Sequence, residues 1–150
     1  MRRVLACVDL TESSQRVLGC ARGLCEPAGQ LIILHVAAPE PDFVGYGVGP
    51  ESVRHSVALE LRSEHRQVQQ LAATSRASGL LVTPLTVQGM AAEKILDHAE
   101  RLEVDFIVLA TKSHSMLHDW VVGSVARAVV KGACRPVVLV PSPATSEPCL

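Results

Sequence analysis

The residues from Phe106 to Val125 have the types and spacing to bind an anion. An apolar run, Phe106 to Ala110, ends in a polar turn, and Gly123 and Ser124 then open a segment whose apolar residues recur with helical spacing. The first N–H groups of a helix have no partner within it, and together with the helix dipole they favour a phosphate. Small residues let a ligand approach the backbone closely, and this stretch offers Ala110, Ser113, Ser115, Gly123 and Ser124. An ordinary strand-to-helix connection, with Gly123 as a turn residue, fits the same spacing.

A second candidate is Asp9, which ends the apolar run Arg3 to Val8. Its carboxylate is placed to meet a ligand, but aspartate is also a frequent turn residue that hydrogen-bonds its own backbone. The residues alone favour this second interpretation, or a cap on the first helix. Thr11 is another candidate for that cap.

Two histidines in the polar loop, His114 and His118, stand four residues apart and could share one face of a helix. Asp119 and Cys134 are possible further ligands, but no third ligand is fixed by spacing. We therefore predict no metal site.

The elements that must position these residues alternate between strand and helix. The runs Phe106–Ala110 and Val137–Val140 are solidly apolar, as in strands that are covered on both faces of a parallel sheet. The expected strands are Arg3–Val8, Leu31–Val36, Leu80–Val87, Phe106–Ala110 and Val137–Val140. The expected helices follow Thr11, span Glu51–Ser78 and Met90–Leu102, and begin at Gly123–Ser124. This order predicts an α/β fold of three layers, with helices on both faces of one sheet and ligands at the carboxyl ends of the strands.

Three details of these elements carry specific expectations. Pro84 interrupts the third run, which predicts an edge strand or a bulge. His35 stands in an otherwise apolar strand and is expected to be a hydrogen-bonded core residue. The long helix has its apolar residues on one face, which we expect to pack inward: Val53, Val57, Leu61, Val68, Leu71 and Ala72.

Composition narrows the possible partners and the compartment. The chain has 150 residues, a net charge of −1 and 3% aromatic residues, which disfavours nucleic acid and anionic membranes as partners. It has no apolar run long enough to span a bilayer. The five cysteines are odd in number and form no C-x-x-C pair, which is typical of reduced thiols in a cytoplasmic protein.

Catalytic motifs are missing from the sequence. It contains neither G-x-x-x-x-G-K-[ST] nor the G-x-S-x-G elbow. A phosphorelay receiver needs an acceptor aspartate at the end of the third strand, and the segment from Val82 to Val87 holds no acid. A dehydrogenase needs G-x-G-x-x-G after the first strand, where this chain has Asp9-Leu10-Thr11-Glu12.

The chain resembles the universal stress protein family over about residues 2 to 141. The matching stretches are VLACVDLTESS, LIILHV, AAEKILDHAERLEVDFIVLAT and VVGSVARAVVKGACRPVVLVP. The last is the most specific, with Gly-Ser-Val-Ala, a helix, and Cys-x-Pro-Val before a valine-rich strand. The resemblance implies one domain over residues 1–141, a five-stranded parallel Rossmann-like sheet of order 3-2-1-4-5, and a flexible tail over residues 142–150.

The resemblance also implies a cofactor site. Many members of the family bind ATP, with Gly-x-x-Gly, nine residues, then Gly followed by Ser or Thr. This chain keeps the spacing, but Ala110 and Ser113 replace the first two glycines. By resemblance, Asp9 holds the ribose, Val36 lines the adenine pocket and the later residues take the phosphates, with Mg²⁺ only if ATP is bound. The implied site residues are Cys7, Val8, Asp9, Val36, Leu109, Ala110, Ser113, Gly123, Ser124 and Val125.

The implied function is a regulatory stress-response module that binds ATP or another adenine nucleotide, with at most slow hydrolysis. Because both glycines are replaced, we predict weak ATP binding or none. The alternative is a nucleotide-free dimer that acts through protein partners. In either case the family resemblance suggests a homodimer in which the last strand, Val137–Val140, pairs with its copy.

Overall fold

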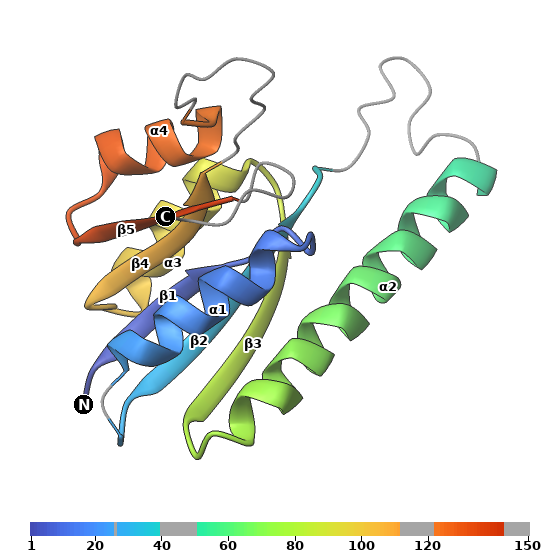
Figure 1. Cartoon of the computed structure of the whole chain (residues 1–150). Coiled ribbons are helices and arrows are strands. Elements are labelled where there is room, and N and C mark those ends of the chain that lie inside the picture. Colours follow the sequence, from blue (N-terminus) through green and yellow to red (C-terminus); the bar gives the residue numbers. More distant parts are fainter. Residues whose placement is uncertain (26, 40–50, 112–121, 143–150) are drawn as a thin grey trace.

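The computed structural model describes residues 1–25, 27–39, 51–111 and 122–142 (Figure 1). Strands and helices alternate along the chain as the apolar runs predict. The strands are β1 (Arg3–Cys7), β2 (Gln30–Ala37), β3 (Leu81–Gln88), β4 (Phe106–Thr111) and β5 (Val137–Pro141). The helices are α1 (Ser13–Leu24), α2 (Glu51–Arg76), α3 (Ala91–Arg101) and α4 (Ser124–Gly132).

The five strands form one sheet in the order β3-β2-β1-β4-β5, and every neighbouring pair is parallel. The predicted α/β class, parallel sheet and strand order are therefore confirmed. The order reverses between β1 and β4, because the chain first adds strands on one side of β1 and then on the other. In such sheets the crevice at this reversal, outside the carboxyl ends of the strands, is where ligands bind.

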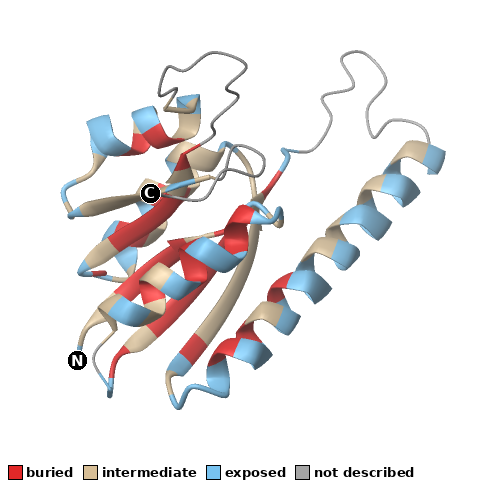
Figure 2. Ribbon diagram, viewed as in Figure 1, coloured by how far each residue is buried: buried red, intermediate tan, exposed pale blue. Residues whose placement is uncertain are grey.

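Each strand sends alternate side chains to the two faces of the sheet, and each face has its own apolar core. On the face covered by α1 and α2, the core includes Val4, Ala6, Leu31, Ile33 and Val108. On the face covered by α3 and α4, it includes Leu5, Ile32, Leu34, Ile107 and Leu109. Almost all of these side chains are buried, which explains why the strands read as unbroken apolar runs (Figure 2).

The two outer strands of the sheet are β3 and β5. Pro84 lies in the middle of β3 opposite Ile33 of β2, and the pairing continues without a break through Gln88. An edge strand tolerates proline because its outer side forms no ladder in the sheet. The edge position predicted from Pro84 is confirmed.

Helix α2 is long, but only its carboxyl-terminal half is well buried. Val68, Ala72 and Ser75 are its buried residues, and Figure 2 shows the amino-terminal half as largely exposed. The predicted inward stripe is therefore only partly correct: Val53, Val57 and Leu61 remain partly exposed. The described helices include none that is both long and apolar enough to cross a membrane.

Candidate functional site

A cavity of about 310 Å³ lies at the carboxyl ends of β1, β2 and β4, where the strand order reverses. Every predicted site residue that the structure describes lines this cavity. Ser113, the remaining predicted residue, lies outside the described residues, as do His114, His118 and Asp119. The lining consists of Cys7, Val8, Asp9, Leu34, His35, Val36, Ala91, Ile95, Leu109, Ala110, Gly123, Ser124, Val125 and Ala126.

Asp9 is held by the turn that follows β1. Leu10 adopts a positive φ of 62°, which turns the chain so that Thr11 points back at the carboxylate. Oδ1 of Asp9 accepts hydrogen bonds from the backbone N–H of Thr11 (3.1 Å) and from the hydroxyls of Thr11 (2.6 Å) and Ser13 (3.2 Å). Among the described residues, Oδ2 has one long contact, 3.5 Å from the Ser13 hydroxyl. One carboxylate oxygen is therefore committed to the turn and the other is left to accept from a ligand.

These contacts correct one prediction and support another. Thr11 does not cap α1, because the N-cap position is Glu12 and no side chain caps it. The Thr11 hydroxyl bonds to Asp9 instead, so Asp9 acts as the turn residue that its type suggests. The two roles of Asp9 are compatible, since they use different oxygens.

The environment of Asp9 keeps it ionised. Burial raises the pKa of Asp9, but hydrogen bonds from Thr11 and Ser13 to the carboxylate outweigh burial and hold the pKa below its ordinary value. The site therefore presents a negative charge that can accept hydrogen bonds from hydroxyl groups.

The walls of the cavity are apolar. Val36 and Leu109 stand at the ends of β2 and β4, and Ile95 approaches from α3. Cys7, at the end of β1, also lines the cavity and is partly exposed. Burial of its thiol raises the pKa to about 12. The sulfur is therefore neutral and adds a weakly polar surface to the cavity. Such a surface suits a flat, uncharged ring system.

The amino end of α4 closes the other side of the cavity. Gly123 takes an extended conformation (φ −61°, ψ 160°) and Ser124 begins the helix. The first helical hydrogen bond of α4 runs from the Arg127 N–H to the Gly123 carbonyl at 3.0 Å. The N–H groups of Ser124, Val125 and Ala126 precede it, and they are the groups that a helix offers to an anion.

Some lining residues were not predicted from the sequence. His35 and Leu34 are neighbours of Val36 on β2, and Ala126 follows Val125 on α4. Ala91 and Ile95 come from α3, which no motif connects to the site. The crossover from β3 to α3 brings them there, and a contact of this kind depends on topology rather than on local sequence.

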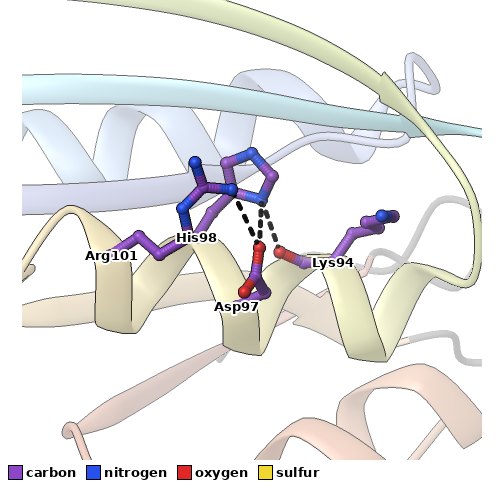
Figure 3. A network of polar contacts seen from close by, with 4 residues as sticks. All are labelled: Lys94, Asp97, His98 and Arg101. Atoms are coloured by element: carbon purple, nitrogen blue, oxygen red, sulfur yellow. Dashed lines mark hydrogen bonds and ion pairs between the residues drawn. The ribbon is translucent and has the colours of Figure 1, made fainter.

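A metal site finds no support in the described part of the chain, where no three His, Cys, Asp or Glu side chains gather. Figure 3 shows a polar network on α3, whose residues do not line the described part of the cavity. His98 Nδ1 lies 2.8 Å from the Lys94 carbonyl and 3.9 Å from Oδ2 of Asp97, which Arg101 Nη1 contacts at 3.4 Å. The carbonyl can only accept, so His98 Nδ1 carries a hydrogen and donates it.

Comparison with known proteins agrees with this geometry. The model of the universal stress protein family matches residues 1–141. The chain belongs to the universal stress protein family. A relative from Coxiella burnetii, universal stress protein A homolog 1, is 31% identical, with 93% of this chain and 95% of the relative covered. A universal stress protein from Thermus aquaticus is 28% identical, with 93% and 98% covered.

Solved structures of the family share the fold. The hypothetical protein MJ0577 is 22% identical with a TM-score of 0.79, covering 96% of this chain and 98% of that one. A universal stress protein in complex with cAMP is 17% identical, with a TM-score of 0.68, and the match covers 93% of this chain and 96% of that one. A universal stress protein family protein from Arabidopsis thaliana with AMP bound is 16% identical, with a TM-score of 0.64, and the match covers 96% of this chain and 94% of that one.

Proposed function

We propose that this universal stress protein is a regulatory stress-response module that binds an adenine nucleotide at the carboxyl ends of β1, β2 and β4. The observation that carries the proposal is that the predicted positions converge, with Asp9, Val36, Ala110 and Ser124 on one cavity. The nucleotides in two related structures, AMP and cAMP, point to the same ligand class.

The chemistry of the cavity fits the parts of a nucleotide one by one. Val36, Ile95 and Leu109 offer apolar surface for the adenine. Oδ2 of Asp9 accepts from a ribose hydroxyl while Oδ1 stays bound to the turn. The amino end of α4 takes phosphate oxygens through its free N–H groups. The volume, about 310 Å³, is at the low end of small-ligand cavities, which suits a nucleoside with its phosphates reaching outward.

Two residues limit the affinity in this proposal. Ala110 and Ser113 replace the glycines of the family motif, and a glycine in such a loop often has positive φ. That conformation costs a residue with a Cβ roughly 1–2 kcal/mol, or about 5–30-fold in affinity, if Ser113 must adopt it. At Ala110 the Cβ itself stands where a ligand passes close to the backbone. We therefore expect weak ATP binding in the wild type.

Isothermal titration with ATP, with and without Mg²⁺, tests this proposal. The double variant Ala110→Gly with Ser113→Gly is expected to bind roughly 5–30-fold more tightly than the wild type. Asp9→Asn in the double variant is expected to weaken binding again, since an amide is a poorer partner for ribose hydroxyls. If the double variant binds no adenine nucleotide at all, the proposal fails. Tight wild-type binding that the glycines leave unchanged would contradict the argument about the loop.

The second part of the proposal is a dimer through β5. The alternative function, a nucleotide-free dimer that acts through protein partners, requires the same dimer. In the described sheet β5 pairs only with β4, so its outer backbone edge is available to a second copy. Val137 to Val140 are all partly exposed, and Val130 on α4 is 49% exposed. Light scattering at micromolar protein is expected to give twice the monomer mass. A monomer mass at every concentration overturns the dimer.

We also propose a cytoplasmic location. The cysteines that the structure describes, Cys7, Cys20, Cys25 and Cys134, are all free thiols. Free thiols persist where the environment is reducing. Fractionation of cells that express a tagged full-length chain would test the location, and recovery in an oxidising compartment would contradict it.

A further inference from the structure

A second hollow lies between α2 and the edge strand β3, and it shares no lining residue with the cavity at the strand ends. It is a groove of about 620 Å³, within the size range of small-molecule sites. Its polar lining consists of Arg62, His65, Arg66 and Gln69 from α2 with Thr86 and Gln88 from β3.

The groove follows from the order of side chains along β3. Val82, Pro84, Thr86 and Gln88 alternate onto the face that α2 covers. Val82 is buried in the core beneath the carboxyl-terminal half of α2, together with Val68 and Ala72. Further along β3 this face becomes polar, and the amino-terminal half of α2 is exposed beside it (Figure 2). A polar lining at this position replaces the apolar contact that normally joins a helix to the sheet.

Two arginines bring positive charge to the described lining of the groove. Arg62 and Arg66 stand one helical turn apart, and neither forms a hydrogen bond or an ion pair with any described residue. No carboxylate is among the described residues that line the groove. The neighbouring Glu64 is turned inward, with Oε2 3.3 Å from Nε2 of His35. Two free guanidinium groups therefore face the same hollow.

The groove also has neutral polar residues in its lining. Oγ1 of Thr86 is buried and has no hydrogen-bond partner among the described residues. Gln69 and Gln88 add neutral amide donors on the α2 and β3 sides.

We propose that this groove is a second ligand site, which binds a small phosphate-bearing anion. Each guanidinium is a rigid fork of donors that matches two oxygens of a phosphate. Two such forks, with His65 and two amides, present more donors than the two oxygens of one carboxylate can accept. Leu61 gives the groove an apolar wall for the organic part of the ligand.

Titration of ¹⁵N-labelled full-length protein with inorganic pyrophosphate tests the site directly. The side-chain Nε–H signals of Arg62 and Arg66 and the side-chain amides of Gln69 and Gln88 are expected to shift together. The amides of Ser124 and Val125 report separately on the cavity at the strand ends. One spectrum therefore distinguishes the two sites. If the cavity at the strand ends binds no nucleotide, the groove signals still report pyrophosphate binding in the groove.

Two double variants that remove equal charge distinguish specific binding in the groove from general electrostatic attraction. Arg62→Gln with Arg66→Gln is expected to weaken pyrophosphate binding in the groove at least about tenfold, since charge-assisted hydrogen bonds are lost. The control, Arg54→Gln with Lys131→Gln, removes the same charge from exposed positions outside the groove and is expected to change affinity less than about twofold. Thermal melts of both variants check that they fold.

Three outcomes overturn the proposal. The first is the absence of shifts at the groove side chains when pyrophosphate is added. The second is an equal loss of affinity in both double variants, which would show that only net charge matters. The third is equally tight binding of succinate, which would remove the preference for phosphate.

Discussion

Nε2 of His35, buried in β2, lies 3.3 Å from Oε2 of Glu64 on α2. The other ring nitrogen, Nδ1, lies 2.9 Å from the Val8 carbonyl, which can only accept, so Nδ1 is the donor there. The distance is that of an ion pair, while the geometry falls short of a hydrogen bond. One imidazole thus ties the turn that carries Asp9 to the long helix.

Removing Glu64 should therefore destabilise the fold. Glu64→Ala removes the carboxylate that lies within ion-pair distance of the buried Nε2 of His35, and we expect a loss of about 1 kcal/mol in the free energy of unfolding. Urea denaturation measures it. Glu64→Gln keeps a polar group at the same place and is expected to lose less. Glu60→Ala, one turn earlier and exposed, is the control and should stay within about 0.5 kcal/mol of the wild type. Equal effects of the two alanine substitutions would contradict the argument.

The sequence predicts the sheet better than it predicts the contacts between layers. Solid apolar strands such as Phe106–Ala110 indicate a parallel sheet, because burial on both faces leaves few polar positions. The strand order came from the family resemblance rather than from any residue pattern. His35 was predicted as a hydrogen-bonded core residue, and its bond to Val8 confirms this. Its contact with Glu64 joins two elements whose relative rotation no local pattern records.

The candidate site likewise combines residues that the sequence predicts with contacts that depend on how the elements pack. The site roles of Asp9 and Val36 came from the family resemblance, whereas Gly123 was predicted as a small residue at the start of a helix. The mistaken capping role of Thr11 has a local cause, since the nearby carboxylate competes for its hydroxyl. The partial exposure of Val53 and Val57 has a distant cause, since packing against the sheet is confined to the other half of α2. Helical periodicity reports which residues share a face, but not how much of that face is covered.

The hydrogen bonds at Asp9 predict how acid affects stability. The pKa of Asp9 in the folded chain is below its reference value of 3.8, so the folded state favours the carboxylate. This contribution to stability is present above the reference value and is lost as the pH falls through the folded pKa. Asp9→Asn cannot titrate and keeps an oxygen acceptor. We expect the wild type to be more stable at neutral pH and the difference to shrink as the pH falls below 3.8. Urea denaturation at several pH values checks this, and a constant difference would contradict it.

The cysteines should differ in reactivity. Burial raises the pKa of the Cys7 thiol from 9.0 to about 12. At pH 8 its thiolate fraction is therefore roughly two to three orders of magnitude smaller than that of a thiol with a pKa of 9.0. Cys134 is exposed, and we expect iodoacetamide to modify it far sooner than Cys7. Peptide mass spectrometry at timed intervals follows each residue. Modification of Cys7 as fast as Cys134 would show that the thiol is not desolvated.

Gly89, between β3 and α3, should not tolerate alanine. Its φ of 142° belongs to a region that residues with a Cβ rarely adopt, and its N–H donates to the Ala37 carbonyl at 3.2 Å, which fixes the conformation. A Cβ there would lie 2.7 Å from Cε of Lys94. The lysine side chain is flexible and can move away, so backbone strain is the larger effect. We expect Gly89→Ala to lower the free energy of unfolding by about 1–3 kcal/mol.

The same substitution at Gly19 is the matched control, because it should act in the opposite direction. Gly19 lies within α1 and is exposed, and a methyl group added there would meet nothing within 4 Å. Alanine there favours the helix by roughly 0.5–1 kcal/mol. Urea denaturation of both variants distinguishes strain at a particular backbone conformation from a general effect of added bulk, and changes of the same sign would contradict it. Gly89 also leads into Ala91, which lines the cavity at the strand ends. A displaced turn should therefore weaken nucleotide binding in the Ala110→Gly, Ser113→Gly background as well, whereas Gly19→Ala should leave that affinity unchanged.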